Sequence, residues 1–390
     1  MALHHRFRHQ TYSPDPPAGP YELLCAPPPP EVGSDEYRGR LAQVGALYRQ
    51  AGVAAIYLVH GTFTGTDALG LITELERFLP LAASGLRRRQ KQLVDTWMGE
   101  AGNYTPLLAR DLERALGGHD PPRIDVRLFQ WSSENHHLGR ADGAVRLIDR
   151  LHAAQHPPGS RVLLWGHSHG GNVFALMTNL LAADLPLRAE FFRAAQSYYR
   201  WPLLGRVDIP VWKRVQELLE GAAEPLGGIR LDIVTFGTPI RYGWDQGGYA
   251  RLLHFVHHRP RPGLPAYRVP YPPTLDELLQ AAAGDYVQQL GIAGTNFPPH
   301  TCAWRSWLAE RQLARLLQPD VRRRDLLARL AAGARVPEAG TTLLVDYGND
   351  PEEHARRHLM GHTIYTRSRW LPFHTEQIAD RFYGRSAAAK

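Results

Sequence analysis

The sequence predicts an α/β fold in which a mainly parallel central sheet is covered by helices on both faces. Short continuous apolar runs, typical of strands buried on both faces, alternate along the chain with segments of helical periodicity. Several of these runs end in glycine-containing turns, at the edge where parallel sheets bind their ligands. With 44% hydrophobic and 21% charged residues, the chain has the composition of a globular protein with a sizeable core.

Six strands are expected, each bounded by glycine, proline or polar turn residues. In chain order they cover residues 53–59, 124–129, 162–165, 229–236, 252–256 and 342–345. Helical segments separate these runs, so the strands are expected to lie parallel and to be connected by helices.

The chain is expected to form one domain preceded by an arm. Residues 1–45 are rich in proline, with Pro27 to Pro30 consecutive, and are expected to be extended and without regular structure. Residues 46–390 are expected to form a single catalytic domain, because large α/β enzymes reach this length as one core with insertions. Three connections exceed the usual length and are interpreted as lids, binding loops or small subdomains. They cover about 63–118, 184–228 and 258–340.

The second insertion contains an amphipathic helical pattern beside a cluster of aromatic residues. The pattern predicts either a lipase-type lid or a helix packed permanently on the core, and periodicity alone does not separate the two. Its apolar residues are Val211, Trp212, Val215, Leu218 and Leu219, and the aromatic residues are Phe191, Phe192, Tyr198, Tyr199 and Trp201.

The third predicted strand runs into Gly-His-Ser-His-Gly at residues 166–170, and a helical pattern follows. A bare G-x-S-x-G match is weak, but the strand before it and the helix after it are the context of a nucleophile elbow. Gly166 and Gly170 are needed there because the strained turn brings strand and helix close together. The hydroxyl of Ser168 is therefore expected to project into a cleft.

His60-Gly61 after an early strand, G-H-S-H-G after a middle strand and a late histidine together resemble the α/β-hydrolase fold, particularly its lipase and esterase branch. The resemblance covers roughly residues 50 to 385. It implies Ser168 as nucleophile, followed along the chain by an acid and then a histidine, with no cofactor. It also implies an oxyanion hole made by the backbone N–H of His169 and an N–H of the early loop, from Thr62 or Phe63.

The catalytic histidine is expected at His362, which follows the last predicted strand and begins an H-x-x-Y pattern resembling the histidine segment of many lipases. His374 is the alternative if residues 363–366 form another strand. His354 and His358 have the separation of two metal ligands, but neither an E-x-x-H pattern nor a third ligand accompanies them. No metal site is therefore predicted.

The acid is open among three aspartates. Many lipases place an aspartate just after the strand that corresponds to residues 252–256, but here that position reads His-His-Arg-Pro-Arg-Pro. Asp346 closes the last predicted strand sixteen residues before His362 and is the preferred candidate. Asp245 and Asp285 are the alternatives.

These assignments predict hydrolysis of a carboxylic ester through an acyl-enzyme on Ser168. Lipid esters, including phospholipids, are favoured by the apolar insertions, and a lid would add contact with a lipid interface. Thioesterase, amidase or acyltransferase activity would use the same groups. The competing hypothesis is a catalytically weak or inactive binding or regulatory protein that keeps the fold without turnover.

The charge and targeting patterns exclude other classes. The net charge of +7 is a mild excess, and the basic runs at residues 87–91 and 322–324 lack the interleaved aromatics of a nucleic-acid platform. No nucleic-acid partner is expected. Two cysteines, the absence of a signal-peptide pattern and the absence of an apolar stretch of membrane-spanning length predict a cytoplasmic protein.

Overall fold

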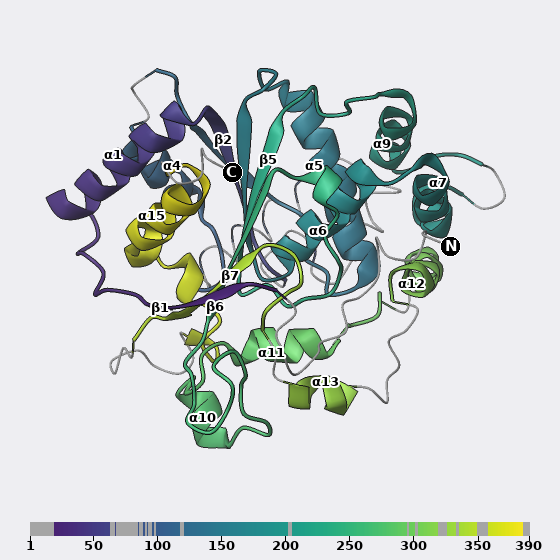
Figure 1. The fold of residues 1–390 in the computed structure, drawn as a ribbon. Helices are drawn as coiled ribbons and strands as arrows, with labels where there is room; N and C mark the ends of the chain where they lie inside the picture. Colours follow the sequence, from purple (N-terminus) through teal and green to yellow (C-terminus); the bar gives the residue numbers. More distant parts are fainter. Residues whose placement is uncertain are drawn as a thin grey trace.

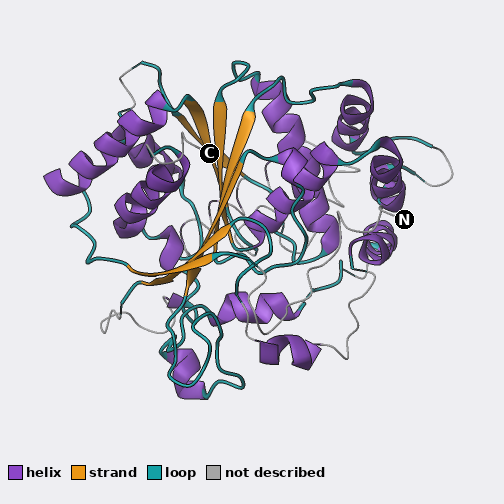
Figure 2. Ribbon diagram, viewed as in Figure 1, coloured by secondary structure: helices purple, strands orange, loops and turns teal. Residues whose placement is uncertain are grey.

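A seven-stranded sheet crosses the computed structural model, and every strand pairs in parallel with its neighbours (Figure 1, Figure 2). The strand order is β1-β7-β6-β5-β4-β2-β3. In that order the strands are Tyr21–Cys25, Thr341–Asp346, Arg251–His257, Arg230–Phe236, Arg161–His167, Val53–Val59 and Asp125–Phe129. The six strands expected from apolar runs are therefore confirmed, and so is the α/β fold class.

The structure describes most of the chain. These residues are 19–62, 67, 85, 89, 92, 96, 99–117, 121–201, 205–294, 296–300, 303–318, 326–332, 335–348 and 358–384. Most of the first predicted insertion, 63–118, lies outside them. No helix in these ranges combines the length and the apolar character of a membrane-crossing segment.

The N-terminal region contributes regular structure, so the prediction of an arm over 1–45 is wrong for much of its length. β1 pairs with β7 from Tyr21 opposite Thr342 to Cys25 opposite Asp346. Helix α1 (Asp35–Gln50) follows, capped by the Ser34 side chain, which accepts a hydrogen bond from the Tyr37 N–H. The consecutive prolines Pro27 to Pro30 lie between these two elements, where the described chain has no regular structure. β1 lacks an apolar strand pattern because it is an edge strand with a largely exposed surface.

Helices cover both faces of the sheet, as predicted (Figure 1). Helices α1, α4 (Pro106–Ala115) and α15 (Leu371–Phe382) pack on one face. The other face carries α5 (His137–Ala154), α6 (His169–Ala182), α7 (Leu185–Ala194), α8 (Gln196–Tyr199), α9 (Pro210–Gly221) and α12 (Trp304–Leu317). The alternation is visible along β2, where Tyr57 belongs to the core of one face and Ile56 and Leu58 to that of the other. Double coverage explains why the predicted strands are continuous apolar runs.

The helix proposed as a lid, α9, is part of the core. The Trp212 ring is buried and lies parallel to the rings of Phe191 and Tyr199, with centroids 6.0 and 5.3 Å away. Its indole N–H donates to the Asp142 carboxylate on α5 at 2.8 Å. A side chain packed on several rings and hydrogen-bonded across the interface is not free to cover a groove. The lid interpretation is therefore replaced by the permanent packing that the same pattern allowed.

The third insertion builds the end of the molecule next to the carboxyl ends of the strands. The Asp285 N–H, just before α11 (Tyr286–Ala293), donates to the carbonyl of His257, the last residue of β6, at 3.0 Å. In Figure 1, α10 (Leu275–Leu279) and α13 (Leu326–Ala332) lie at the same end of the molecule as α11. Short 3₁₀ helices complete the described elements: η1 (Gln246–Gly248), η3 (Ile364–Thr366) and η4 (Ser368–Trp370).

Candidate active site

Ser168 occupies a strained turn between β4 and α6. Its backbone has φ 51° and ψ −130°, outside the regions that non-glycine residues ordinarily adopt. Two contacts hold this conformation: the Ser168 N–H donates to the Phe236 carbonyl at 2.8 Å, and the Thr238 hydroxyl donates to the Ser168 carbonyl at 2.7 Å. Such strain persists only where the surroundings over-determine it, and it is found at functional sites. The predicted strand, turn and helix around Ser168 are confirmed.

The two glycines of the motif allow the close approach that the elbow requires. A β-carbon on Gly166 would lie 2.5 Å from a ring carbon of Phe174 on α6. One on Gly170 would lie 2.8 Å from the carbonyl oxygen of Val59 at the end of β2. Neither position has room for a side chain, as expected from the motif.

The loop after β2 passes directly over Ser168. A β-carbon on Gly61 would lie 2.7 Å from the Ser168 β-carbon and 3.3 Å from its hydroxyl oxygen. Thr62 follows at once, whereas Phe63 lies outside the described residues. On the other side, His169 is the first residue of α6, so its N–H has no place in the hydrogen-bond ladder of the helix. The chain segments expected to supply the two oxyanion-hole donors therefore flank Ser168.

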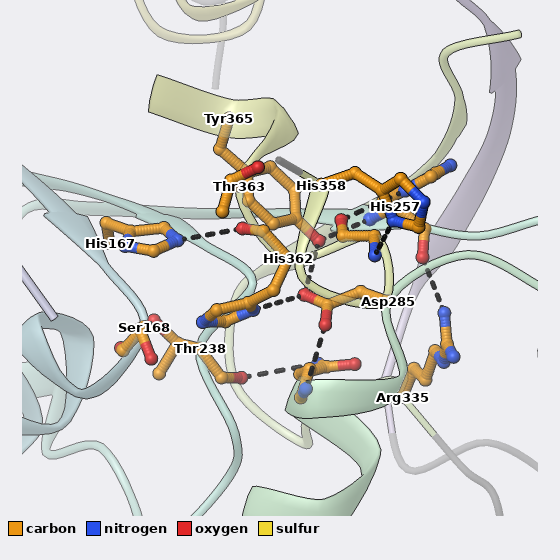
Figure 3. Close-up of polar contacts among 12 residues, drawn as sticks. His167, Ser168, Thr238, His257, Asp285, Arg335, His358, His362, Thr363 and Tyr365 are labelled. Atoms are coloured by element: carbon orange, nitrogen blue, oxygen red, sulfur yellow. Dashed lines mark hydrogen bonds and ion pairs between the residues drawn. The ribbon is translucent and has the colours of Figure 1, made fainter. Parts of the chain in front are cut away.

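His362 and Asp285 form a buried pair beside the serine (Figure 3). Nδ1 of His362 lies 2.8 Å from Oδ2 of Asp285. Because a carboxylate only accepts, Nδ1 carries a proton, and in the neutral ring Nε2 then carries the lone pair. Figure 3 shows the Nε2 edge of the ring turned toward Ser168, with no hydrogen bond drawn between the two residues. Such a contact is often long without substrate and closes in the complex.

The surroundings of Asp285 keep its carboxylate charged. Oδ2 also accepts from the Tyr365 hydroxyl at 2.9 Å, and Oδ1 accepts from the Gln288 N–H at 2.9 Å as the N-cap of α11. Burial raises the pKa of Asp285, but the charge and hydrogen bond of His362, the Gln288 N–H and the Arg335 charge outweigh it and leave the pKa below its ordinary value. A charged acceptor at this position fixes the tautomer of His362.

Asp346, the preferred acid from sequence, lies elsewhere. Its Oδ1 accepts from Nε of Arg259 and from the Gly348 N–H, both at 2.9 Å. It lines a cavity of about 940 Å³ that is also lined by Arg259 and Tyr347. The preference for Asp346 is therefore corrected in favour of Asp285, because the third insertion returns the start of α11 to His362. Asp245 instead accepts from the Gly247 N–H at 3.0 Å and caps η1.

His374, the alternative base, is buried in the core on α15. Its Nε2 contacts the Tyr347 hydroxyl at 2.8 Å, and burial lowers its pKa to about 3. The strand at 363–366 that would have favoured it is absent, because Ile364–Thr366 form η3. The structure thus brings together Ser168, His362 and Asp285.

Two further residues support the pair and were not assigned a role from sequence. Nε2 of His167 donates to the backbone carbonyl of His362 at 3.1 Å, and the two rings lie 4.6 Å apart. Burial and then the His362 charge lower the pKa of His167 to about 3, so it stays a neutral donor that positions the His362 loop. Tyr365 is the tyrosine of the H-x-x-Y pattern, and its contact with Asp285 gives that pattern a structural meaning.

Similarity to known proteins assigns no function to this chain, and no metal centre does so among the described residues. No protein-family model, no curated protein and no solved structure matches the chain. Among the described residues no group of three or more His, Cys, Asp or Glu side chains is arranged to hold a metal ion. Function is therefore inferred from the geometry around Ser168.

Proposed function

We propose that this protein is a serine hydrolase of the α/β-hydrolase type, which cleaves carboxylic esters through an acyl-enzyme on Ser168. The observation that carries the proposal is the His362–Asp285 hydrogen bond, which leaves the Nε2 lone pair of His362 facing a serine on a strained elbow. The chain order Ser168, Asp285, His362 is also the order that the α/β-hydrolase resemblance implies.

Each group has a defined task in the proposed reaction. His362 Nε2 takes the proton of Ser168 as Oγ attacks the ester carbonyl, and Asp285 stabilises the imidazolium that forms. The N–H of His169 and an N–H of the early loop, from Thr62 or Phe63, hold the oxyanion of the tetrahedral intermediate. His362 then protonates the leaving alkoxide, which leaves the acyl group on Ser168. Water, activated by the same histidine, releases the acid.

The proposed substrate class is carboxylic esters in general. The apolar insertion that favoured lipid esters is packed into the core through Trp212, so acyl-chain length forms no part of the proposal. Thioesters and amides would pass through the same tetrahedral intermediate.

Acid-quenched turnover of 4-nitrophenyl acetate tests the proposal. During steady-state hydrolysis we expect an acetyl group on the peptide that contains Ser168, because a covalent intermediate divides the reaction into two steps. Stopped-flow traces should show a burst of 4-nitrophenol wherever deacylation is the slower step. Acetylation of another residue, or a folded protein that hydrolyses none of the ester, thioester and amide probes, would contradict it. Asp346→Asn serves as a matched control that should retain the acetylated Ser168 peptide.

A further inference from the structure

Two arginines, Arg140 on α5 and Arg241 in the loop after β5, are fully buried, and among the described residues neither contacts an acidic side chain. The Arg140 guanidinium, from α5, donates to the Tyr242 hydroxyl at 2.9 Å and to the side-chain oxygens of Asn135 at 3.1 Å and Asn296 at 2.8 Å. All three acceptors are neutral. Within the described part of the chain, no carboxylate contacts this group.

The guanidinium group of Arg241 has fewer and longer hydrogen bonds than that of Arg140. Its Nη1 is 3.4 Å from the Gly291 carbonyl and its Nη2 is 3.2 Å from Oε1 of Gln318, while the buried Nε has no partner among the described residues. Burial and then the charge of Arg140 lower the pKa of Arg241 to about 9. Both guanidinium groups are therefore out of contact with water and bound by neutral acceptors.

The carboxylate of Glu310, whose charge acts on the pKa of Arg241, already has other hydrogen-bond partners. Its carboxylate accepts from the backbone N–H groups of His137 at 3.1 Å and Leu138 at 2.7 Å, at the start of α5. It also lies 3.5 Å from Nδ1 of His136. Glu310 thus caps a helix and pairs with a histidine rather than with either guanidinium group.

The loop that carries Arg241 contacts the backbone of the nucleophile. The ring of His169, the residue after Ser168, is held neutral first by burial and then by the charges of Arg140, Arg241 and His362, which lower its pKa. Arg241 also follows closely on Thr238, whose hydroxyl binds the Ser168 carbonyl. Loops at the carboxyl ends of parallel strands are where such folds bind ligands.

A buried charge is costly unless it is paired, and the planar guanidinium fork matches a carboxylate or a phosphate. Here the partners are neutral amides, a tyrosine and a backbone carbonyl, so no described residue supplies the counter-charge. Asn296 and Gln318, whose side-chain oxygens bind the two guanidinium groups, are each partly exposed. Exchange of these amides for an anion would restore the charge balance.

We propose that Arg140 and Arg241 bind an oxyanionic group of the substrate, a carboxylate or a phosphate, so that the ester cleaved at Ser168 is an anionic one. This inference rests on the proposed function and defines its substrate class. Charge-assisted hydrogen bonds to such a group favour the anionic ester over a neutral one of the same shape.

Two matched ester pairs test the proposal on the full chain. One pair is 4-nitrophenyl hemisuccinate against 4-nitrophenyl butyrate, with the carboxylate on the acyl side. The other is butyrylated glycerol 3-phosphate against monobutyrylglycerol, with the phosphate on the alcohol side. In at least one pair we expect kcat/KM for the anionic ester to exceed that for the neutral ester by about 10- to 100-fold. The responding pair identifies the anion.

Arg241→Gln and Arg140→Gln should each lower this anionic-to-neutral ratio toward one, and Arg241→Lys should restore part of it. Arg214→Gln is the matched control, because Arg214 pairs with Asp149 on an exposed part of α9 and should leave the ratio unchanged. A second measurement does not depend on the variants being folded. Inorganic phosphate or succinate should inhibit neutral-ester hydrolysis by the wild-type protein competitively, and chloride at equal ionic strength should not.

The outcomes separate the two proposals. Wild-type turnover of neutral esters through Ser168, with no anionic preference in either pair and no competition by phosphate or succinate, overturns the anion site and leaves the hydrolase proposal standing. The opposite outcome is a wild-type protein that hydrolyses no ester but whose melting temperature rises with phosphate, with this rise lost in Arg241→Gln. That outcome supports the anion site and rules out the hydrolase.

Discussion

Replacing Ser168 by alanine is expected to lower kcat for ester hydrolysis by a factor on the order of 10⁴ or more, because the covalent step has no other nucleophile. The melting temperature should stay close to that of the wild type. The Ser168 side chain makes no capping hydrogen bond to α6, so its hydroxyl contributes little to stability. Steady-state kinetics on 4-nitrophenyl acetate together with thermal unfolding measure both quantities.

Ser168→Gly is the companion variant, because it tests the strained backbone separately from the chemistry. Glycine adopts φ near 51° without the steric conflict that a β-carbon meets there. Ser168→Gly should therefore be more stable than Ser168→Ala by about 1 kcal/mol, although both are inactive. A glycine variant less stable than the alanine variant would mean that the elbow is not under strain, and turnover retained by either would remove Ser168 from the mechanism.

Asp285→Asn is expected to lower kcat by a factor on the order of 10⁴ with the fold intact. The new amide would donate to His362 Nδ1 and so place the proton on Nε2, the wrong nitrogen for accepting the Ser168 proton. An asparagine keeps the shape of the side chain and an oxygen for the Gln288 N–H that Asp285 now caps. The measurement is kcat for each variant, with circular dichroism to confirm folding.

Asp346→Asn is the matched control for this substitution. Asp346 pairs with Arg259 at a partly exposed position, so its loss should cost no more than about 1 kcal/mol of stability and leave kcat within about threefold. A larger loss of turnover in Asp346→Asn than in Asp285→Asn would show that the His362 loop is oriented from β7, as the sequence first indicated.

The parts of the fold that could be predicted from sequence are those in which local pattern and tertiary environment agree. Strands such as β4 and β5 are buried on both faces and therefore read as apolar runs. β1 was missed because an exposed edge strand has no such run, and its partner β7 lies more than 300 residues away along the chain. The α9 pattern described an apolar face correctly but could not identify what that face contacts.

The residues of the site also divide into those that a local motif predicts and those that depend on tertiary structure. Ser168 and His362 were located by local motifs, and the tyrosine of H-x-x-Y proved to bind Asp285. The acid could not be ranked from sequence, because the contact between Asp285 and His362 depends on how the 258–340 insertion folds back across 77 residues. The role proposed for Arg241 could not be predicted from sequence either, because a single arginine in a loop is exposed in most proteins. Burial and the absence of a counter-charge are properties of the assembled structure.

If Ser168 is an activated nucleophile, it should react with a serine-directed fluorophosphonate. After digestion, mass spectrometry should locate one adduct per chain on Ser168, and none on the Ser168→Ala protein. Labelling should be slow in Asp285→Asn and as fast as wild type in Asp346→Asn, because Asp285 binds His362 Nδ1 whereas Asp346 binds Arg259. A folded wild-type protein that stays unlabelled, or an adduct that persists in Ser168→Ala, would contradict the account.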